Sequence, residues 1–310
     1  MPEYPDVVVY VDRLRAHAVG SVLEGIRIGN PFVVRTAVPP LAEAFGQTVR
    51  AVSRIGKRIV IHLGDSTEPD RLSLVIHPMI AGRLRWKAAG ANHRGKDVLA
   101  VFDLVAGPTG RTGALVFTEA SPKKRASLHL VRGAEALAQF DRGGLDVLAA
   151  DRDAFAARLR SERHTLKRSL TDPTLFDGIG NAYSDEILFR AKLSPVKLST
   201  SITDDEITSL YEAIRAIMTE WADRLRAEVG DGFPDKVTAF RPEMAVHGKY
   251  REPCVVCGSP IQRIVHAENE SNYCAQCQVG GRLLADRALS QLLKSDWPRT
   301  LDELEERRKP

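Results

Sequence analysis

Cys254-Val255-Val256-Cys257 and, after sixteen further residues, Cys274-Ala275-Gln276-Cys277 hold all four cysteines of the 310-residue chain. Two Cys-x-x-Cys pairs at this separation place four thiolates where two tight turns can close a tetrahedral Zn²⁺ site. Two disulfides or four free thiols are the alternatives, but nothing else in the chain indicates an oxidising compartment. Four sulfurs fill the coordination shell, so the spacing predicts one structural, non-catalytic Zn²⁺ on Cys254, Cys257, Cys274 and Cys277.

Composition and charge are those of an ordinary globular protein, with 44% hydrophobic and 27% charged residues. The length suffices for two domains and a zinc element. No apolar run approaches the ~20 residues that a membrane span needs, and residues 1–6 lack the features of a signal peptide. We therefore expect a cytoplasmic protein with no membrane partner. The net charge of +4 permits a nucleic-acid partner without demonstrating one.

The pattern of apolar residues changes twice along the chain. Residues 5–18 have the helical pattern, with Val7, Tyr10 and Leu14 on one face. Strand-like runs follow at residues 26–28, 59–63, 72–76, 98–102 and 115–117, which predicts an antiparallel sandwich or barrel. After about residue 151 the period is helical again.

These changes predict a multi-domain α+β fold. Its parts are an N-terminal β-sandwich domain flanked by helices and a linker containing Gly143-Gly144, then a helical domain, a zinc finger and a peripheral tail. The predicted boundaries are, in the same order, residues 1–136, 137–150, 151–249, 250–284 and 285–310. Residues 229–252 are polar and turn-rich, and we expect them to form a long loop that leads to the zinc site.

A glycine-rich turn, Gly178-Ile179-Gly180-Asn181, precedes a helix with acidic residues in its early turns. Such a turn leaves backbone N–H groups free at a helix N-terminus, where a phosphate can dock, and Asn181 can add a side-chain donor. A grip of this kind positions nucleic acid without reading bases. An ordinary turn between two helices with a glycine cap explains the local sequence equally well.

Basic residues gather in two places. Ser121-Pro122-Lys123-Lys124-Arg125 is a short basic turn in the first domain. A second group lies in the helical region before Gly178 and consists of Arg158, Arg160, Arg163, Lys167 and Arg168. Taken singly, such residues are usually a solvated face.

Taken together, the motifs give the chain a resemblance to the formamidopyrimidine-DNA glycosylase/endonuclease VIII family of base-excision repair enzymes. The matching segments are Met1-Pro2-Glu3-x-Pro5, Gly56-Lys57, Gly178-x-Gly180-Asn181-x-Tyr183 and the four-cysteine finger ending in Cys277-Gln278. They occur in the family's order and span nearly the whole chain. The resemblance implies a β-sandwich, then a helix-two-turn-helix domain, then a zinc finger.

The resemblance also implies a mechanism at the N-terminus. Removal of Met1 leaves Pro2 with a free secondary amine, which can attack C1′ of a damaged nucleotide and displace the base. Glu3 is then the proton shuttle, and Lys57 matches the family lysine that binds phosphate near the lesion. If Met1 stays, the Pro2 nitrogen is an amide and this chemistry is impossible.

Base removal from a duplex also requires something to fill the gap that the extruded nucleotide leaves. Met79 matches the family's gap-filling methionine on a strand loop, although a buried core methionine is the alternative. The family's loop Asp-Pro-Arg-Arg-Phe-Gly reads Ser121 to Ala126 here, without the aromatic wedge. Lys124 or Arg125 is left to enter the helix opposite the lesion, and Lys123 is a further predicted DNA contact.

Two acidic or basic positions of the family pattern also differ. The second acidic residue near the start is Asp6 rather than Glu. The finger position that usually holds a phosphate-binding arginine is Asn269, which has neither the charge nor the forked donors of arginine. Either Arg263 compensates from the other strand of the finger, or the grip on the lesion is weaker.

The leading hypothesis is a monomeric, nucleoid-associated DNA glycosylase with AP lyase activity. Its substrate would be double-stranded DNA with oxidised or otherwise damaged bases or abasic sites. The alternative is a non-catalytic relative that binds damaged DNA. Intact Pro2, Glu3 and Lys57 argue against that alternative, because a protein that only binds DNA has no use for them. A third hypothesis, a finger that binds protein only, conflicts with the turn at Gly178.

Overall fold

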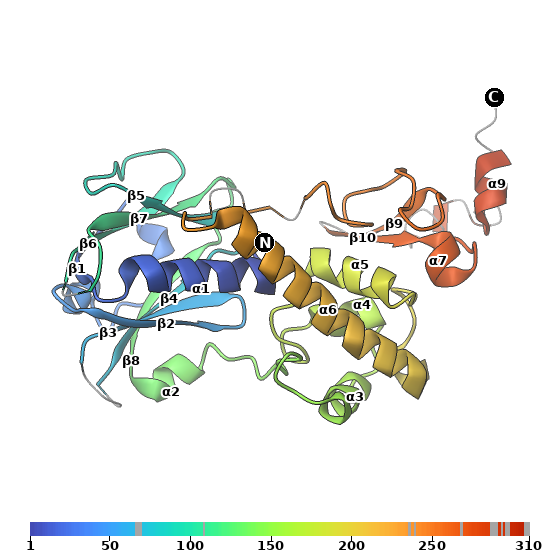
Figure 1. Cartoon of the computed structure of the whole chain (residues 1–310), viewed down its shortest axis with the longest axis horizontal. Helices are drawn as coiled ribbons and strands as arrows, with labels where there is room; N and C mark the ends of the chain where they lie inside the picture. The colour runs from blue at the N-terminus through green and yellow to red at the C-terminus, as the bar shows by residue number, and fades with distance from the viewer. Residues whose placement is uncertain are drawn as a thin grey trace. The chain divides into compact units, whose positions relative to one another are not determined.

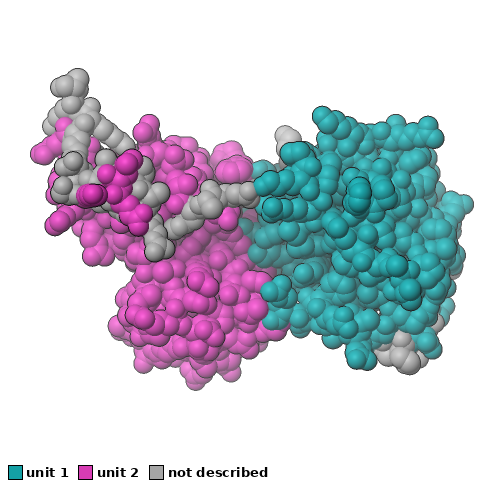
Figure 2. Space-filling model, turned by 180° about the vertical axis from the view of Figure 1, so that it is seen from behind, with its two compact units in different colours: residues 1–142, 220–238 teal, residues 143–219, 239–310 magenta. Residues whose placement is uncertain are grey.

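Two units divide the chain: residues 1–142 with 220–238, and residues 143–219 with 239–310 (Figure 2). We refer to them as unit 1 and unit 2. The computed structural model describes residues 1–65, 70–107, 109–234, 237–238, 240–266, 269–285, 291–292, 294 and 298–306. Helix α6 (Asp204–Val229) begins in unit 2, and its residues from Glu220 onward belong to unit 1.

Unit 1 is a sandwich of two four-stranded sheets, in which all neighbouring strands are antiparallel (Figure 1). The first sheet has the order β1 (Val22–Ile28), β6 (Val98–Val105), β7 (Gly113–Glu119), β5 (Gly82–Lys87). The second has the order β2 (Val49–Ile55), β3 (Arg58–Leu63), β4 (Leu72–His77), β8 (Ser127–Arg132). The shorter helices of unit 1 are η1 (Pro31–Val33), η2 (Leu41–Ala44) and α2 (Gly133–Ala138). The predicted N-terminal β-sandwich is thus confirmed.

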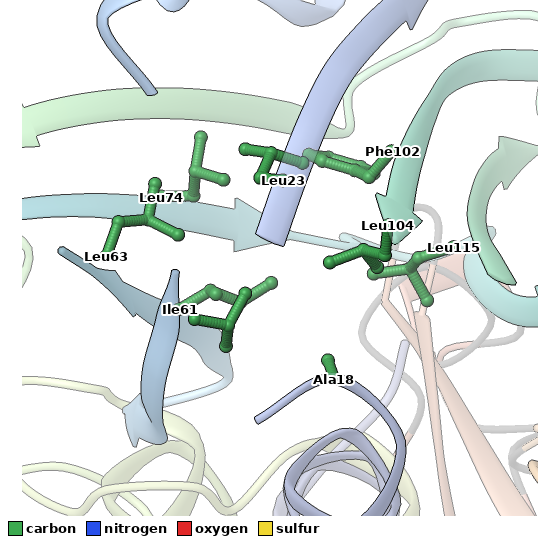
Figure 3. A pocket seen from close by; sticks show the side chains of 9 residues that line it. Ala18, Leu23, Ile61, Leu63, Leu74, Phe102, Leu104 and Leu115 are labelled. Carbon is green, nitrogen blue, oxygen red and sulfur yellow. The ribbon is translucent and has the colours of Figure 1, made fainter. Parts of the chain in front are cut away.

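The core of unit 1 lies between the inner faces of the two sheets and helix α1 (Tyr4–Ala18). Tyr10 and Leu14 of α1 are fully buried in it, as their helical spacing predicts. A small apolar cavity of about 10 Å³ remains there (Figure 3). Only apolar side chains line it: Ala18, Leu23, Val49, Ile61, Leu63, Leu74, Phe102, Leu104 and Leu115. With no polar partner for a ligand or a water, it is a packing gap in the core.

Unit 2 combines a helical part and a zinc-finger hairpin. The helical part contains α3 (Arg152–Arg160), α4 (Leu166–Thr171), α5 (Asn181–Arg190), η3 (Ser199–Ser201) and the first turns of α6. Phe155 packs against Phe176 and Tyr211, with ring centroids 5.1 and 5.7 Å apart. The finger consists of β9 (Ile261–His266), β10 (Asn269–Cys274) and α7 (Ala275–Val279). A helix-two-turn-helix and a C-terminal zinc finger are therefore present, as the resemblance implies.

The end of the chain packs on the finger. Leu283, Leu284 and Leu301 are buried against Tyr273 of β10, and Leu301 is the first residue of α9 (Leu301–Glu306). The Leu284 N–H donates to the Tyr273 hydroxyl at 2.8 Å, and burial raises the pKa of that hydroxyl to about 12. These contacts make the described part of the tail a component of the finger's small core.

The membrane prediction can be tested on the helices. Within the described ranges, no helix combines the length and the apolar character needed to cross a bilayer.

Candidate nucleic-acid interface and zinc centre

Strand register brings three predicted site segments to one end of the sandwich in unit 1. His77, the last residue of β4, pairs with Ser127, the first of β8. Gly82, the first residue of β5, pairs with Glu119, the last of β7. The loops 78–81 and 120–126 therefore leave the sheets side by side. The turn that carries Lys57 joins β2 to β3 at this same end, because β3 runs antiparallel to β4.

The N-terminus lies close to Lys57 as well. Burial lowers the pKa of the Met1 amino group, the nearby Glu3 carboxylate raises it, and Arg83 and Lys57 lower it further. Pro2 and Glu3 are both buried, and the Glu3 side chain and backbone together are only 2% exposed. Carboxylates are rarely buried to this degree, and those that are buried often belong to a functional site.

Asp6, which stands where the family pattern has the longer glutamate, fits into the first turn of α1. It is the third residue of the helix, and its Oδ2 accepts a hydrogen bond from the Glu3 backbone N–H at 3.0 Å. An acid at this position caps the helix and interacts favourably with its dipole. Asp6 thereby fixes the backbone of Glu3.

The loop after β4 is a closed turn in which the Gly82 N–H donates to the Pro78 carbonyl at 2.8 Å. A side chain at Gly82 would collide with Pro78, so this position requires glycine. Met79 has a φ of 53° and is half-buried in the loop, not in the core. Ile80 is 55% exposed, which makes it the more exposed apolar side chain of the two. Sequence reasoning singled out Met79 and missed Ile80.

The loop 120–126 is shaped by Glu119, which is 1% exposed. Its two carboxylate oxygens each accept one backbone N–H at 3.0 Å, from Arg125 and from Ala126. The Lys124 ammonium turns inward to the Glu119 carbonyl and to Asp97, and Lys124 has a φ of 41°. The side chains of Lys123 and Arg125 are exposed.

His77 is a further member of this end of the sandwich that sequence reasoning missed. Burial lowers its pKa to about 3, with contributions from Arg58, Lys57 and His129. The imidazole is therefore neutral at physiological pH and can donate a hydrogen bond without carrying charge. The only sequence signal was its place directly before Pro78 and Met79.

In unit 2 the glycine turn positions Asn181 as the first residue of α5. Gly178 has a φ of 79°, a conformation that favours glycine. The Lys167 ammonium donates to the Asn181 carbonyl at 2.6 Å, and Asn181 Nδ2 donates to the Glu270 carbonyl at 3.0 Å. Since Asn269 is the neighbour of Glu270 in β10, the structure brings the two predicted asparagines close to each other.

Two buried acids of α5 bind the segment that leads to the finger. Glu186 accepts backbone N–H groups from Ala245, Val246 and His247 at 2.8, 2.9 and 2.9 Å. Asp185, 1% exposed, is 2.8 Å from His247 Nδ1 and 2.5 Å from the Lys167 ammonium. These acids read in the sequence as helix N-terminal residues, and their structural role was missed.

Several of the basic residues before Gly178 stabilise the fold. Arg158 donates to the carbonyls of Gly143 and Thr174 at 2.8 and 2.9 Å. Arg160 pairs with Asp204 at 2.9 Å. Arg160, Arg163 and Arg168 are exposed, while Arg158 and Lys167 are half-buried, so the solvated face is smaller than the sequence indicates.

The four cysteines form a single cluster, with all Sγ atoms within 4.8 Å of one another. The Cys254–Cys277 and Cys257–Cys274 Sγ pairs are 3.9 and 3.5 Å apart. Tetrahedral Zn²⁺ with Zn–S bonds of about 2.3 Å needs S–S distances of about 3.8 Å. Burial raises the pKa of Cys274 and raises that of Cys277 to about 11, so these two need a cation to stay thiolates, whereas hydrogen bonds with Ser259 outweigh burial and the pKa of Cys257 is lowered to about 6. The donor set fits one structural Zn²⁺, as predicted.

Sequence models of known families match all three parts of the chain. The formamidopyrimidine-DNA glycosylase N-terminal domain matches residues 1–139, and the H2TH domain of the same enzymes matches residues 145–226. A zinc finger found in FPG and IleRS matches residues 251–279. The three matches, in this order along the chain, are the domains of the zinc-finger DNA repair glycosylases.

Relatives of nearly full length agree. Formamidopyrimidine-DNA glycosylases of Desulforamulus reducens and Thermus thermophilus are each 30% identical; the matches cover 90% and 91% of this chain and 99% and 100% of theirs. An uncharacterized formamidopyrimidine-DNA glycosylase-like protein of Mycobacterium tuberculosis is 37% identical over 151 residues, 49% of this chain and 94% of that protein. The chain belongs to the formamidopyrimidine-DNA glycosylase/endonuclease VIII family, so the resemblance is confirmed.

Solved structures show the same fold. The Lactococcus lactis Fpg in complex with an abasic-site DNA has a TM-score of 0.75 at 26% identity, and the match covers 89% of this chain and 99% of that one. A complex of the same protein with an oxidized-pyrimidine DNA has a TM-score of 0.76, with coverage of 90% and 100%.

Proposed function

We propose that this family member is an active glycosylase with AP lyase activity that uses Pro2 as its nucleophile. Its substrate is double-stranded DNA with oxidised or otherwise damaged bases or abasic sites, on which it acts as a monomer. The observation that carries the proposal is the buried Pro2-Glu3 pair beside Lys57 at the loop-bearing end of unit 1.

The chemistry begins at the Pro2 nitrogen once Met1 is removed. Its lone pair forms a bond to C1′ while the bond from C1′ to the damaged base breaks. The base leaves with a proton that Glu3 supplies. Glu3 then takes the N–H proton of the attached Pro2 and passes it to O4′ as the C1′–O4′ bond breaks, which opens the sugar ring and leaves C1′ joined to Pro2 as an iminium ion. Loss of the acidified C2′ proton to a base then expels the 3′ phosphate, which cleaves the strand.

The surroundings of the amine support this role. An amine must be deprotonated to attack, and at the terminus of the chain with Met1 the balance of effects is in that direction: burial and the charges of Arg83 and Lys57 lower the pKa of the Met1 amino group, while Glu3 and Asp6 raise it. Glu3 is buried next to Pro2, where a carboxylate can transfer protons without competition from bulk water. Lys57 would bind the phosphate beside the lesion.

DNA contacts outside this centre come from both units. We propose that Asn181 and Asn269 bind the phosphate backbone in unit 2. In unit 1, Lys123 and Arg125 contact the duplex from their exposed loop, and the inward-facing Lys124 fixes the shape of that loop. Met79 and the more exposed Ile80 lie on the loop that fills the gap left by the extruded nucleotide.

Borohydride trapping on an abasic-site duplex tests the proposal. Protein that starts at Pro2 should form a covalent adduct, and protein that keeps Met1 or an N-terminal tag should form none. A matched Pro2→Gly variant keeps a terminal amine and should retain partial trapping. Binding without trapping in the Pro2 form would instead support the alternative of a non-catalytic protein that binds damaged DNA.

A further inference from the structure

We infer that Arg263 is a phosphate-binding residue of the finger that works together with Asn181 on the DNA backbone. The inference rests on the proposed function, because it assumes that unit 2 binds DNA. It concerns a residue on β9, the strand opposite Asn269.

The Arg263 side chain is held at two points and still reaches solvent. Its guanidinium carbon lies 4.4 Å from the centre of the Tyr250 ring, and its Nη1 lies 3.2 Å from Glu270 Oε2. The side chain is nevertheless 44% exposed. A guanidinium carries five N–H donors in a rigid fork that matches phosphate geometry. Stacking and pairing therefore preorganise Arg263, so less entropy is lost when it binds an anion.

Glu270 connects Arg263 to the proposed grip of the glycine turn. Its backbone carbonyl accepts Asn181 Nδ2 at 3.0 Å, and its side chain accepts both Arg263 and Asn272. Asn272 is 1% exposed and pairs with Arg263 in the strand register. Glu270 of β10 thus fixes the Asn181 amide and the Arg263 guanidinium relative to each other. Two groups that donate to the same DNA backbone need such a fixed arrangement.

Arg251 provides a matched control. Its guanidinium carbon also lies over the Tyr250 ring, at 5.1 Å, and its side chain is exposed. Its backbone N–H donates to the Ile261 carbonyl at 2.9 Å. Among the described residues, Glu270 accepts side-chain hydrogen bonds from Arg263, Asn272 and Asn181, and none from Arg251. Both arginines therefore lie over the Tyr250 ring, but only Arg263 is linked to Asn181 through Glu270.

The experiment measures the dissociation constant of the protein for an undamaged duplex and for an abasic-analogue duplex. The salt concentration is varied from about 50 to about 200 mM, because phosphate contacts make affinity fall steeply over this range. Arg263→Gln should weaken both duplexes equally, by about tenfold at low salt, and should make the salt slope less negative by about 0.9. Arg263→Lys should keep the slope, and Arg251→Gln should change neither quantity. Zinc content should stay unchanged in all variants.

An unchanged salt slope in Arg263→Gln, or an equal change in Arg251→Gln, overturns the inference. Failure of the proposed function looks different: the unmodified protein would then neither bind duplex DNA nor form a borohydride adduct. A protein that traps DNA normally while Arg263→Gln keeps its slope refutes the role of Arg263 alone.

Discussion

Replacement of Glu186 by glutamine tests how unit 2 holds its finger. In the native protein, one carboxylate oxygen accepts the Val246 and His247 N–H groups and the other accepts the Ala245 N–H. Glutamine keeps one acceptor oxygen and places an NH₂ group against the third N–H. The helix α5 and the segment at 245–247 then lose one bond and face a donor–donor clash.

The magnitude follows from these contacts. A hydrogen bond to a charged group is worth about 1.5–3 kcal/mol, and a buried donor without an acceptor costs about 1–3 kcal/mol. Because Glu186 is 4% exposed, water cannot compensate. We expect the segment to lose about 3–5 kcal/mol of local stability.

Hydrogen exchange of the backbone amides at residues 245–247 measures this loss directly. Glu186→Gln should speed exchange there by at least 10², roughly what 3 kcal/mol corresponds to. Glu162→Gln is the control, because Glu162 is an exposed residue of the same unit. Protection that stays at the native level in Glu186→Gln would refute the view that this carboxylate anchors the segment.

Three further predictions concern the chemistry, the metal and the tail. Glu3→Gln should slow base excision by about 10²–10⁴-fold because the proton shuttle is lost, and should slow cleavage at a pre-formed abasic site less; single-turnover kinetics on both substrates measure the difference. Chelation should remove one Zn²⁺ per chain and abolish DNA binding before unit 1 unfolds, which metal analysis, binding and circular dichroism follow together; full binding by metal-free protein would contradict this. Leu301→Asp places a charge in the core formed with Tyr273 and should speed zinc loss to a chromogenic chelator, whereas Asp302→Asn on the same helix should not.

The sequence could predict the parts of the fold whose signals are local. The cysteine spacing identified the zinc centre, because metal geometry constrains Cys-x-x-Cys pairs over a few residues. Alternating and helical apolar patterns identified α1 and strands of both sheets, because burial of one face follows from the period. These predictions needed no knowledge of distant partners.

Other features of the site depend on residues far apart in the chain. Glu186 meets the His247 backbone 61 positions away, and Asn181 meets Glu270 89 positions away. Glu119 looks like an ordinary strand end, yet its carboxylate shapes the loop that carries Arg125. Such pairings come from tertiary packing, which the charge and spacing of residues in a single sequence do not reveal. For the same reason, Arg158 was grouped with a solvated face although it binds two carbonyls.

The loop at 78–81 was predictable from the sequence only in part. The resemblance predicted that Met79 lies on a loop between strands, and the structure has a closed turn from Pro78 to Gly82 at this position. Which apolar side chain extends from it depends on backbone conformation: Met79 takes a left-handed conformation, and Ile80 is the more exposed residue. The sequence therefore indicated the loop and Met79 on it, and the greater exposure of Ile80 became visible only in the structure.

The central claim is that the Pro2 nitrogen forms the covalent bond to DNA, and peptide mapping of the trapped adduct tests it most directly. Protein that starts at Pro2 is reduced with borohydride on an abasic-site duplex, digested with trypsin and nuclease, and analysed by mass spectrometry. The account predicts that the sugar remnant lies on the peptide from Pro2 to Arg13, at its N-terminal nitrogen. A remnant on Lys57, with an unmodified N-terminal peptide, would contradict it.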